Sequence, residues 1–240
     1  MKIVFLTAIG VGGATVFGAV LGMLIKQISF RFREMLLSFC AGIMLCAAIL
    51  GLILPAAEIS MCNTIGGIIT GAVCMDLLAG VIPCLQHLFT QNANTDANKI
   101  LLFVTAIAIH NLPEGIAAGV SFGTGSNKQA LLIAGSIALQ NIPEGMVIIA
   151  PLLSIGIREN QTFLLAFMTG VIEIIGTLLG YIAVSAAAAI LPFALAFAGG
   201  TMLYVIFNEI IPDTHKIGKN ASYSLLTGFC VMLLLDALLP

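Results

Sequence analysis

Charged residues are scarce in this chain: Asp, Glu, Lys and Arg make up 8% of its 240 residues, and the formal net charge is −2. The nine Lys and Arg residues form no basic patch with interleaved aromatic residues, so nucleic acid is not an expected partner. The longest polar stretch, at residues 90–99, has the length of a short flexible connection. We therefore expect residues 1–240 to form a single domain with no soluble part.

Signatures of catalysis and of thiolate metal clusters are missing as well. The six cysteines show no CxxC spacing, which argues against a zinc-thiolate cluster or a disulfide framework and favours buried apolar packing. Among them, Cys46 is the one to examine for proximity to a metal. Neither HExxH nor GxSxG occurs, and His110 is the only histidine deep in an apolar run. We expect neither an enzyme nor a resident cofactor.

Long apolar runs are abundant instead. The chain is 60% hydrophobic with a mean hydropathy of +1.15, and about 20 helical residues cross a bilayer core of roughly 30 Å. The runs are continuous and do not alternate as barrel strands do, so the spans must be helices. The sequence predicts an all-α, polytopic bundle of eight transmembrane helices. Their expected bounds are 3–25, 36–57, 65–87, 100–122, 129–153, 162–184, 190–212 and 221–239.

The distribution of Lys and Arg predicts the orientation. The first apolar run follows Lys2 and has no convincing cleavage site, so we keep it as the first span rather than a signal peptide. Only Lys2 and Lys128 fall on one side of the eight spans. The other side holds Lys26, Arg31, Arg33, Lys99, Arg158, Lys216 and Lys219. Positive residues favour the cytoplasm, which places both termini outside it, in a multi-pass protein of the cell (inner) membrane.

Five carboxylates fall within the predicted spans: Asp76, Glu114, Glu144, Glu173 and Glu209. Each costs at least about 2.5 kcal/mol in the membrane, and no Lys or Arg inside a span is available to pair with them. Protons or bound cations must supply the counter-charge.

Two related hexapeptides gather these groups: HNLPEG at residues 110–115 and QNIPEG at residues 140–145. His110 and Glu114 are one helical turn apart on one face, as are Gln140 and Glu144. Pro113 and Pro143 each free a backbone carbonyl, which is tolerated at mid-membrane where it lines a polar site. A short connection at 123–128 makes the two helices antiparallel neighbours, so the motifs meet. Their N and O ligands suit a borderline divalent transition metal.

Glycines recur four residues apart and predict close helix contacts. The pairs are Gly18/Gly22, Gly67/Gly71, Gly115/Gly119 and Gly176/Gly180.

At these motifs the chain resembles the ZIP (Zrt-, Irt-like protein) metal transporters, especially the bacterial branch similar to GufA. The resemblance extends to residues 38–45 and 54–58, to 171–176 around Glu173, and to 208–215. The predicted eight spans, with both termini outside the cytoplasm, also match the family.

The resemblance implies a two-metal centre midway across the membrane and import of a divalent transition metal into the cytoplasm, with zinc first and cadmium, iron, manganese and cobalt as further substrates. The first site would consist of Met44, His110, Glu114, Gln140 and Glu144. The second would consist of Asn111, Asn141 and Glu173, bridged by Glu114 and Glu144. Asn208, Glu209 and His215 would lie along the exit pathway. The family also implies alternating access, in which helices one, four, five and six move against the others, and a homodimer.

Three features depart from many relatives. Gln140 stands in place of a histidine, which removes a nitrogen ligand from the first site, and Asn141 stands in place of an aspartate, which removes a charge from the second. The loop after helix three lacks a histidine-rich run and retains only His87 at its edge, so metal sensing by this loop is not expected. Three alternatives stay open: a metal-selective channel, an intramembrane metal-dependent hydrolase, and a receptor or scaffold without transport.

Overall fold

The computed structural model describes residues 1–25, 28–90, 110–154, 156–214 and 218–238, and these residues form helices with no β-strand. Seven of the described helices are long and apolar enough to cross a membrane. The expected span at 100–122 is described only from residue 110 and is helical over 110–120. The all-α, multi-pass fold predicted from the sequence is confirmed. The loop expected at 90–99 lies almost entirely outside the described residues.

The helices follow the predicted spans closely. Three single helices are α1 (Lys2–Ile25), α4 (Met61–Thr90) and α10 (Lys219–Leu238). Two more follow the short helix η2 (Ser121–Thr124): α6 (Asn127–Ser154) and α7 (Glu159–Ala186), the latter leading to η3 (Ala188–Ile190). Two helices are composite: α2 (Phe30–Cys46) with η1 (Ala47–Ile53) and α3 (Leu54–Ile59), and α8 (Leu191–Val205) with η4 (Ile206–Ile210) and α9 (Ile211–Thr214).

Helix α2 begins six residues earlier than the apolar pattern predicts. Ser29 caps it, accepting a hydrogen bond from the Phe32 amide at 3.3 Å. The first turn therefore takes in the polar segment at 30–34, and Glu34 is buried, paired with Arg33 at 2.8 Å. The predicted start at residue 36 follows the apolar run alone, and the charged residues before it lie outside that run.

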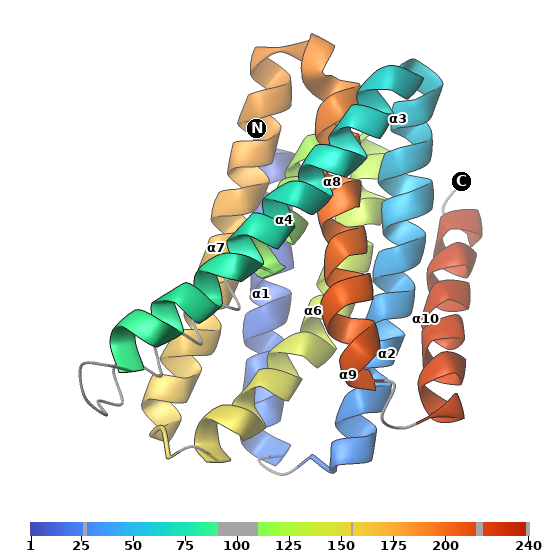
Figure 1. Cartoon of the computed structure of the whole chain (residues 1–240). Helices are drawn as coiled ribbons and strands as arrows, with labels where there is room; N and C mark the ends of the chain where they lie inside the picture. Colours follow the sequence, from blue (N-terminus) through green and yellow to red (C-terminus); the bar gives the residue numbers. More distant parts are fainter. Residues whose placement is uncertain (26–27, 91–109, 155, 215–217, 239–240) are drawn as a thin grey trace.

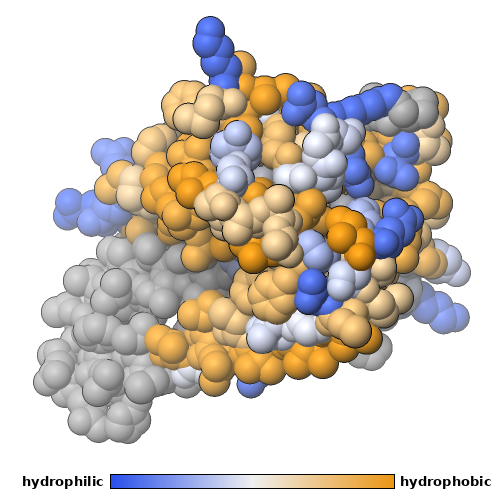
Figure 2. Space-filling view, turned by 90° about the horizontal axis from the view of Figure 1, so that it is seen from above, coloured by the Kyte–Doolittle hydropathy of each residue, from blue (hydrophilic) through white to orange (hydrophobic). Residues whose placement is uncertain are grey.

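Large apolar side chains are exposed on the outside of the bundle, and several polar and charged side chains are buried among the apolar ones of its core. Leu6, Leu24 and Leu77 are more than 60% exposed, and hydrophobic residues dominate the view from above, with hydrophilic ones in scattered groups (Figure 2). Glu173 and Asn141 are fully buried. An apolar outer surface, with polar groups enclosed inside the bundle, is what a bilayer as solvent requires. In Figure 1, α1 begins and α10 ends toward the same side of the bundle; which side faces the cytoplasm stays a prediction.

The helices form two groups. The first helix group comprises α1, the helix over 110–120, α6 and α7; the second comprises α2 with η1 and α3, α4, α8 with η4 and α9, and α10. In the first, α1 packs along α6 and α7; in the second, α4 packs on α8 and α10 on α2. Between the groups, α2 packs against α6. Figure 1 shows α4 crossing the bundle obliquely in front of α8.

Glycines let backbones touch inside each group. A Cβ added to Gly18 would lie 2.0 Å from the Ile142 carbonyl oxygen, and one added to Gly42 would lie 1.9 Å from that of Leu225. The four glycine pairs predicted from the sequence all make such contacts with a neighbouring helix. In the described helices, these backbone approaches join members of the same group. Each group is therefore packed more closely than the boundary between them.

Two π-helical segments, η1 and η4, were not predicted. Each is followed within two residues by a proline, Pro55 or Pro212. A proline ring clashes with the carbonyl four residues earlier, and a widened turn relieves that clash. The spans expected at 36–57 and 190–212 are helical, and each contains a π-helical segment that the apolar pattern does not indicate.

Candidate metal centre

A buried carboxylate, Glu173 of α7, is the centre of the polar interior. Thr15 of α1 donates a hydrogen bond to its two oxygens at 2.8 Å, and Asn141 of α6 donates to Oε2 at 2.8 Å. Asn111, on the helix over 110–120, donates to Oε1. All four helices of the first group thus meet at one side chain. Such a network strongly favours a single arrangement of these helices, since an unpaired buried carboxylate is costly.

The two hexapeptides meet as the sequence predicts. Gln140 Nε2 donates to Glu114 Oε1 at 2.8 Å, and both side chains are buried. The Cys40 thiol of α2 donates to the Gln140 carbonyl at 3.5 Å. Pro143 lies inside α6, which continues through it.

A cavity of about 300 Å³ lies beside this pair, between the two helix groups. The first group contributes His110, Asn111, Glu114 and Glu144, and the second contributes Met44 and Glu209. Leu37, Val147, Ile148, Val205 and Ile210 complete its wall. The lining brings together imidazole nitrogen, carboxylate and amide oxygen, and a thioether sulfur.

Two carboxylate oxygens at this cavity are buried without a hydrogen-bond partner: Glu114 Oε2 and Glu144 Oε1. An orphaned carboxylate oxygen costs about 1–3 kcal/mol or more. A cation bound in the cavity would satisfy both, since a carboxylate oxygen is a good ligand for a divalent metal. The amide oxygen of Gln140 is likewise buried and unpaired.

One ion pair joins the two helix groups at the cavity. The His110 imidazole pairs with the Glu209 carboxylate, and both side chains are about 30% exposed. Glu209 belongs to the π-helical segment η4. In this conformation a first-group candidate ligand is therefore held by the second group.

The other predicted residues have different surroundings. Asn208 donates to the Tyr204 carbonyl at 3.3 Å and does not line the cavity. His215 lies outside the described residues. Cys46 packs in an apolar cluster with Ile43 and Met232. Asp76, also within a span, accepts a hydrogen bond from Tyr204 at 2.7 Å.

Within the described ranges, His, Cys, Asp and Glu side chains form no group of three placed to hold a metal ion. Four side chains of these types line the cavity, and two of them, His110 and Glu209, are paired with each other; the other two are Glu114 and Glu144. A complete ligand set here needs the amide or thioether groups as well, or the release of His110 from Glu209.

Sequence reasoning missed Thr15. A threonine in an apolar helix carries no motif, and its partner lies 158 residues away. The only available signal was its place among the small residues of α1. The same holds for the Val11 carbonyl, which accepts from Asn141 Nδ2 at 3.3 Å.

Comparisons with known proteins find relatives that align with most of this chain. The family model described as ZIP Zinc transporter matches residues 86–236. Zinc transporter GufA of Myxococcus xanthus is 42% identical over 147 residues, which cover 60% of this chain and 58% of that protein. Zinc transporter ZIPB of Bordetella bronchiseptica is 35% identical over 242 residues, covering 94% of this chain and 78% of that protein. Zinc transporter ZupT of Chlorobaculum parvum is 29% identical over 246 residues, covering 92% and 91%. The chain thus spans less than two thirds of GufA but most of ZIPB and ZupT.

Proposed function

Because this chain belongs to the ZIP family, in its GufA-like branch, we propose that it carries a divalent transition metal across the membrane into the cytoplasm. The family consists of membrane transporters rather than enzymes, and the relatives compared above are named zinc transporters. Zinc is therefore the first candidate substrate, with cadmium, iron, manganese and cobalt next. The metal is a cargo and not a resident cofactor.

The cavity between the helix groups is the observation that carries this proposal. Its lining contains three kinds of metal-ligand atom: imidazole nitrogen, amide or carboxylate oxygen, and thioether sulfur. Among them are the two unpaired carboxylate oxygens of Glu114 and Glu144. We assign the first metal site to these glutamates with His110, Met44 and the unpaired amide oxygen of Gln140. Imidazole and thioether favour zinc or cadmium over calcium and magnesium.

The second metal site would centre on Glu173 with Asn111 and Asn141, and would share Glu114 and Glu144 with the first. Three donors already hold the two oxygens of Glu173. A metal bound there must displace at least one of these hydrogen-bond donors. The carboxylate of Glu173 is the one negative charge of this second site that the first site does not share. We therefore propose that this second site binds metal weakly and mainly positions the shared glutamates.

Movement between the two helix groups would carry the metal. Backbone contacts at glycines hold each group together, whereas Gly51 of η1 faces the side chain of Ile133 across the boundary, where a Cβ would lie 3.0 Å from Ile133 Cγ1. Side chains slide past one another more readily than interlocked backbones. We propose alternating access in which the first group moves against the second.

The His110–Glu209 pair would be broken in each cycle. A metal at the first site requires the imidazole, so metal binding competes with Glu209 for His110. Released, Glu209 offers a carboxylate on the second group, at the boundary that the metal leaves. We propose that Glu209 thereby assists exit toward the cytoplasm, with Asn208 and His215 as further candidates along the route.

The test is metal uptake by proteoliposomes that contain a chelating dye, with zinc, cadmium, iron, manganese and cobalt compared. We expect saturable uptake of zinc or cadmium, and its loss in His110→Ala and Glu144→Ala. Asp236→Asn serves as a control, because that side chain is exposed at the far end of α10. Uptake that rises linearly with concentration would favour a channel with the same site. No uptake of any metal by folded protein would overturn the proposal and return attention to a receptor or a hydrolase.

A homodimer is the assembly that the family resemblance implies. Sedimentation of the detergent-solubilised protein would measure its mass after correction for bound detergent, and a monomer at all concentrations would contradict a dimer.

A further inference from the structure

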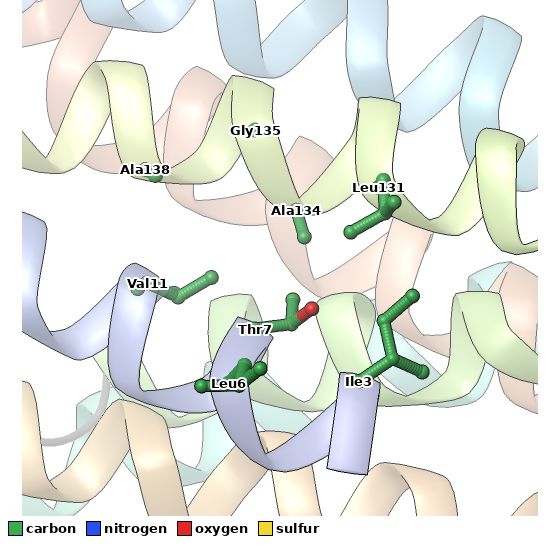
Figure 3. A pocket seen from close by; sticks show the side chains of 9 residues that line it. Ile3, Leu6, Thr7, Val11, Leu131, Ala134, Gly135 and Ala138 are labelled. Carbon is green, nitrogen blue, oxygen red and sulfur yellow. The ribbon is translucent and has the colours of Figure 1, made fainter.

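An open apolar groove runs along the outside of the first helix group, between α1 and α6. It has a volume of about 340 Å³. In Figure 3, Ile3 and Leu131 lie at one end and Val11 and Ala138 at the other, with Thr7 and Ala134 between them. Gly10 and Gly135 also line it, and a Cβ added to either would meet nothing within 4 Å. Within the part of the chain that the structure describes, no side chain fills this space next to the two glycines.

The groove has the length of one leaflet. From Ile3 to Val11, eight residues at 1.5 Å each give about 12 Å, against roughly 15 Å for half of a bilayer core. The outer walls are exposed, with Leu6 68% and Leu131 45% accessible, and buried Val11 and Ala134 lie deeper in the groove. A groove on a membrane-spanning surface is filled by lipid chains or by another helix, since a void would forfeit the contacts of its lining.

The mouth of the groove carries two cations. Lys2 precedes Ile3, and Lys128 lies three residues before Leu131, which is one turn along the same face of α6. Both lysines are exposed. They are also the two Lys and Arg residues that the sequence assigns to the non-cytoplasmic side. The two lysines predicted for the non-cytoplasmic side therefore lie together, at the end of a groove that is long enough for part of an acyl chain.

We propose that this groove binds an anionic glycerophospholipid, with an acyl chain along α1 and α6 and the headgroup phosphate at Lys2 and Lys128. The inner end of the groove lies close to the candidate metal centre, because Val11 accepts a hydrogen bond from Asn141, which also holds Glu173. A bound lipid would brace α1 against α6, the pair of helices that supports this cluster. The proposal does not depend on transport.

The absence of tryptophan from the chain makes the test direct. Leu131→Trp places a single fluorophore in the groove wall, and Leu179→Trp, on α7 and 52% exposed, places one on a lipid-facing surface elsewhere. Each variant is reconstituted in mixed phosphatidylglycerol and phosphatidylcholine vesicles in which one lipid carries a brominated chain. The strength of quenching at each mole fraction gives the relative association constant of the two lipids.

We expect phosphatidylglycerol to be preferred roughly 5- to 30-fold at position 131, since a lysine near an anionic headgroup contributes about fivefold. No such preference is expected at position 179. Lys2→Gln with Lys128→Gln should remove the preference. Gly135→Leu should weaken quenching by filling the groove, and Gly13→Leu, at an equally open glycine on α1, should not.

Equal quenching by the two lipids at position 131, or a preference that survives loss of both lysines, would overturn the proposal. Absence of quenching by either lipid would also overturn it and would indicate that a protein segment, such as a second copy of this chain, occupies the groove.

Discussion

At the scale of single residues, the interior is organised by which carboxylate oxygens have partners. Glu173 has donors on both oxygens, whereas Glu114 and Glu144 each keep one oxygen without a partner at the cavity. This difference assigns them different tasks. Glu173 fixes the helices, and the other two glutamates face the space where a cation fits.

Thr15→Val removes one donor to Glu173 with little change of shape. We expect it to lower the free energy of unfolding by about 1–3 kcal/mol, since a buried carboxylate loses a partner. Denaturant unfolding in detergent, followed by far-ultraviolet circular dichroism, measures this. Thr169→Val is the matched control, because that buried hydroxyl donates to the Ala166 carbonyl of its own helix, at 2.7 Å, and to no other described residue. Equal losses in the two variants would contradict the role of Thr15.

Glu209→Gln keeps the shape of the side chain and removes its charge. Because the metal no longer competes with a carboxylate for His110, we expect zinc to bind about tenfold more tightly, which is about 1.4 kcal/mol. Isothermal titration calorimetry gives the dissociation constant. Weaker binding by this variant would mean that Glu209 is itself a ligand rather than a competitor.

The residues of the hexapeptides were predictable and their partners were not. Spacing four apart on a helix places His110 over Glu114 without knowledge of the fold. The pairing of His110 with Glu209 spans 99 residues, and Glu209 lies within the wide turn η4, where the 3.6-residue period does not hold. Local periodicity contains no information on either.

At the scale of helices, close backbone contact at glycine positions the metal centre. A Cβ on Gly145 would lie 2.2 Å from the carbonyl oxygen of Thr15, so α6 approaches α1 directly beside the donor to Glu173. A larger side chain at position 145 must therefore disturb both the packing of α6 on α1 and the hydrogen bond from Thr15 to Glu173.

Gly145→Ala should destabilise the protein by about 1–3 kcal/mol, the typical cost of overpacking, and should reduce zinc uptake. Gly13→Ala, on the exposed side of α1 with nothing near its Cβ, should leave both unchanged. Thermal unfolding and proteoliposome uptake of the two variants, compared with the native protein, provide the measurement. A tolerated Gly145→Ala would show that α1 and α6 separate more easily than the contact suggests.

Apart from the start of α2, the described ends of the predicted spans lie within a few residues of the helix ends, because a bilayer demands apolar length. Two details were not predicted: the start of α2 in a charged segment, and the π-helical segments before Pro55 and Pro212. These depend on a cap and on a steric clash, and neither changes the mean hydropathy of a run.

At the scale of the whole molecule, two closely packed helix groups meet at a boundary that contains the cavity. Sequence patterns predicted close contacts at the four spaced glycine pairs but not at other glycines such as Gly42 and Gly145. They did not say which helices pair, since a small residue has no preferred partner. The division into groups emerges only from the assembled bundle.

A reversible cross-link between the two helix groups tests whether movement at their boundary carries the metal. Gly51→Cys with Ile133→Cys, on a background whose native cysteines are replaced, brings two thiols within reach across the boundary, as the 3.0 Å approach to Ile133 Cγ1 indicates. Zinc binding and zinc uptake are measured before oxidation, after oxidation and after reduction, with each single-cysteine variant as control. Our prediction is that the oxidised protein still binds zinc but transports none, and that reduction restores uptake. Undiminished uptake by fully cross-linked protein would contradict it.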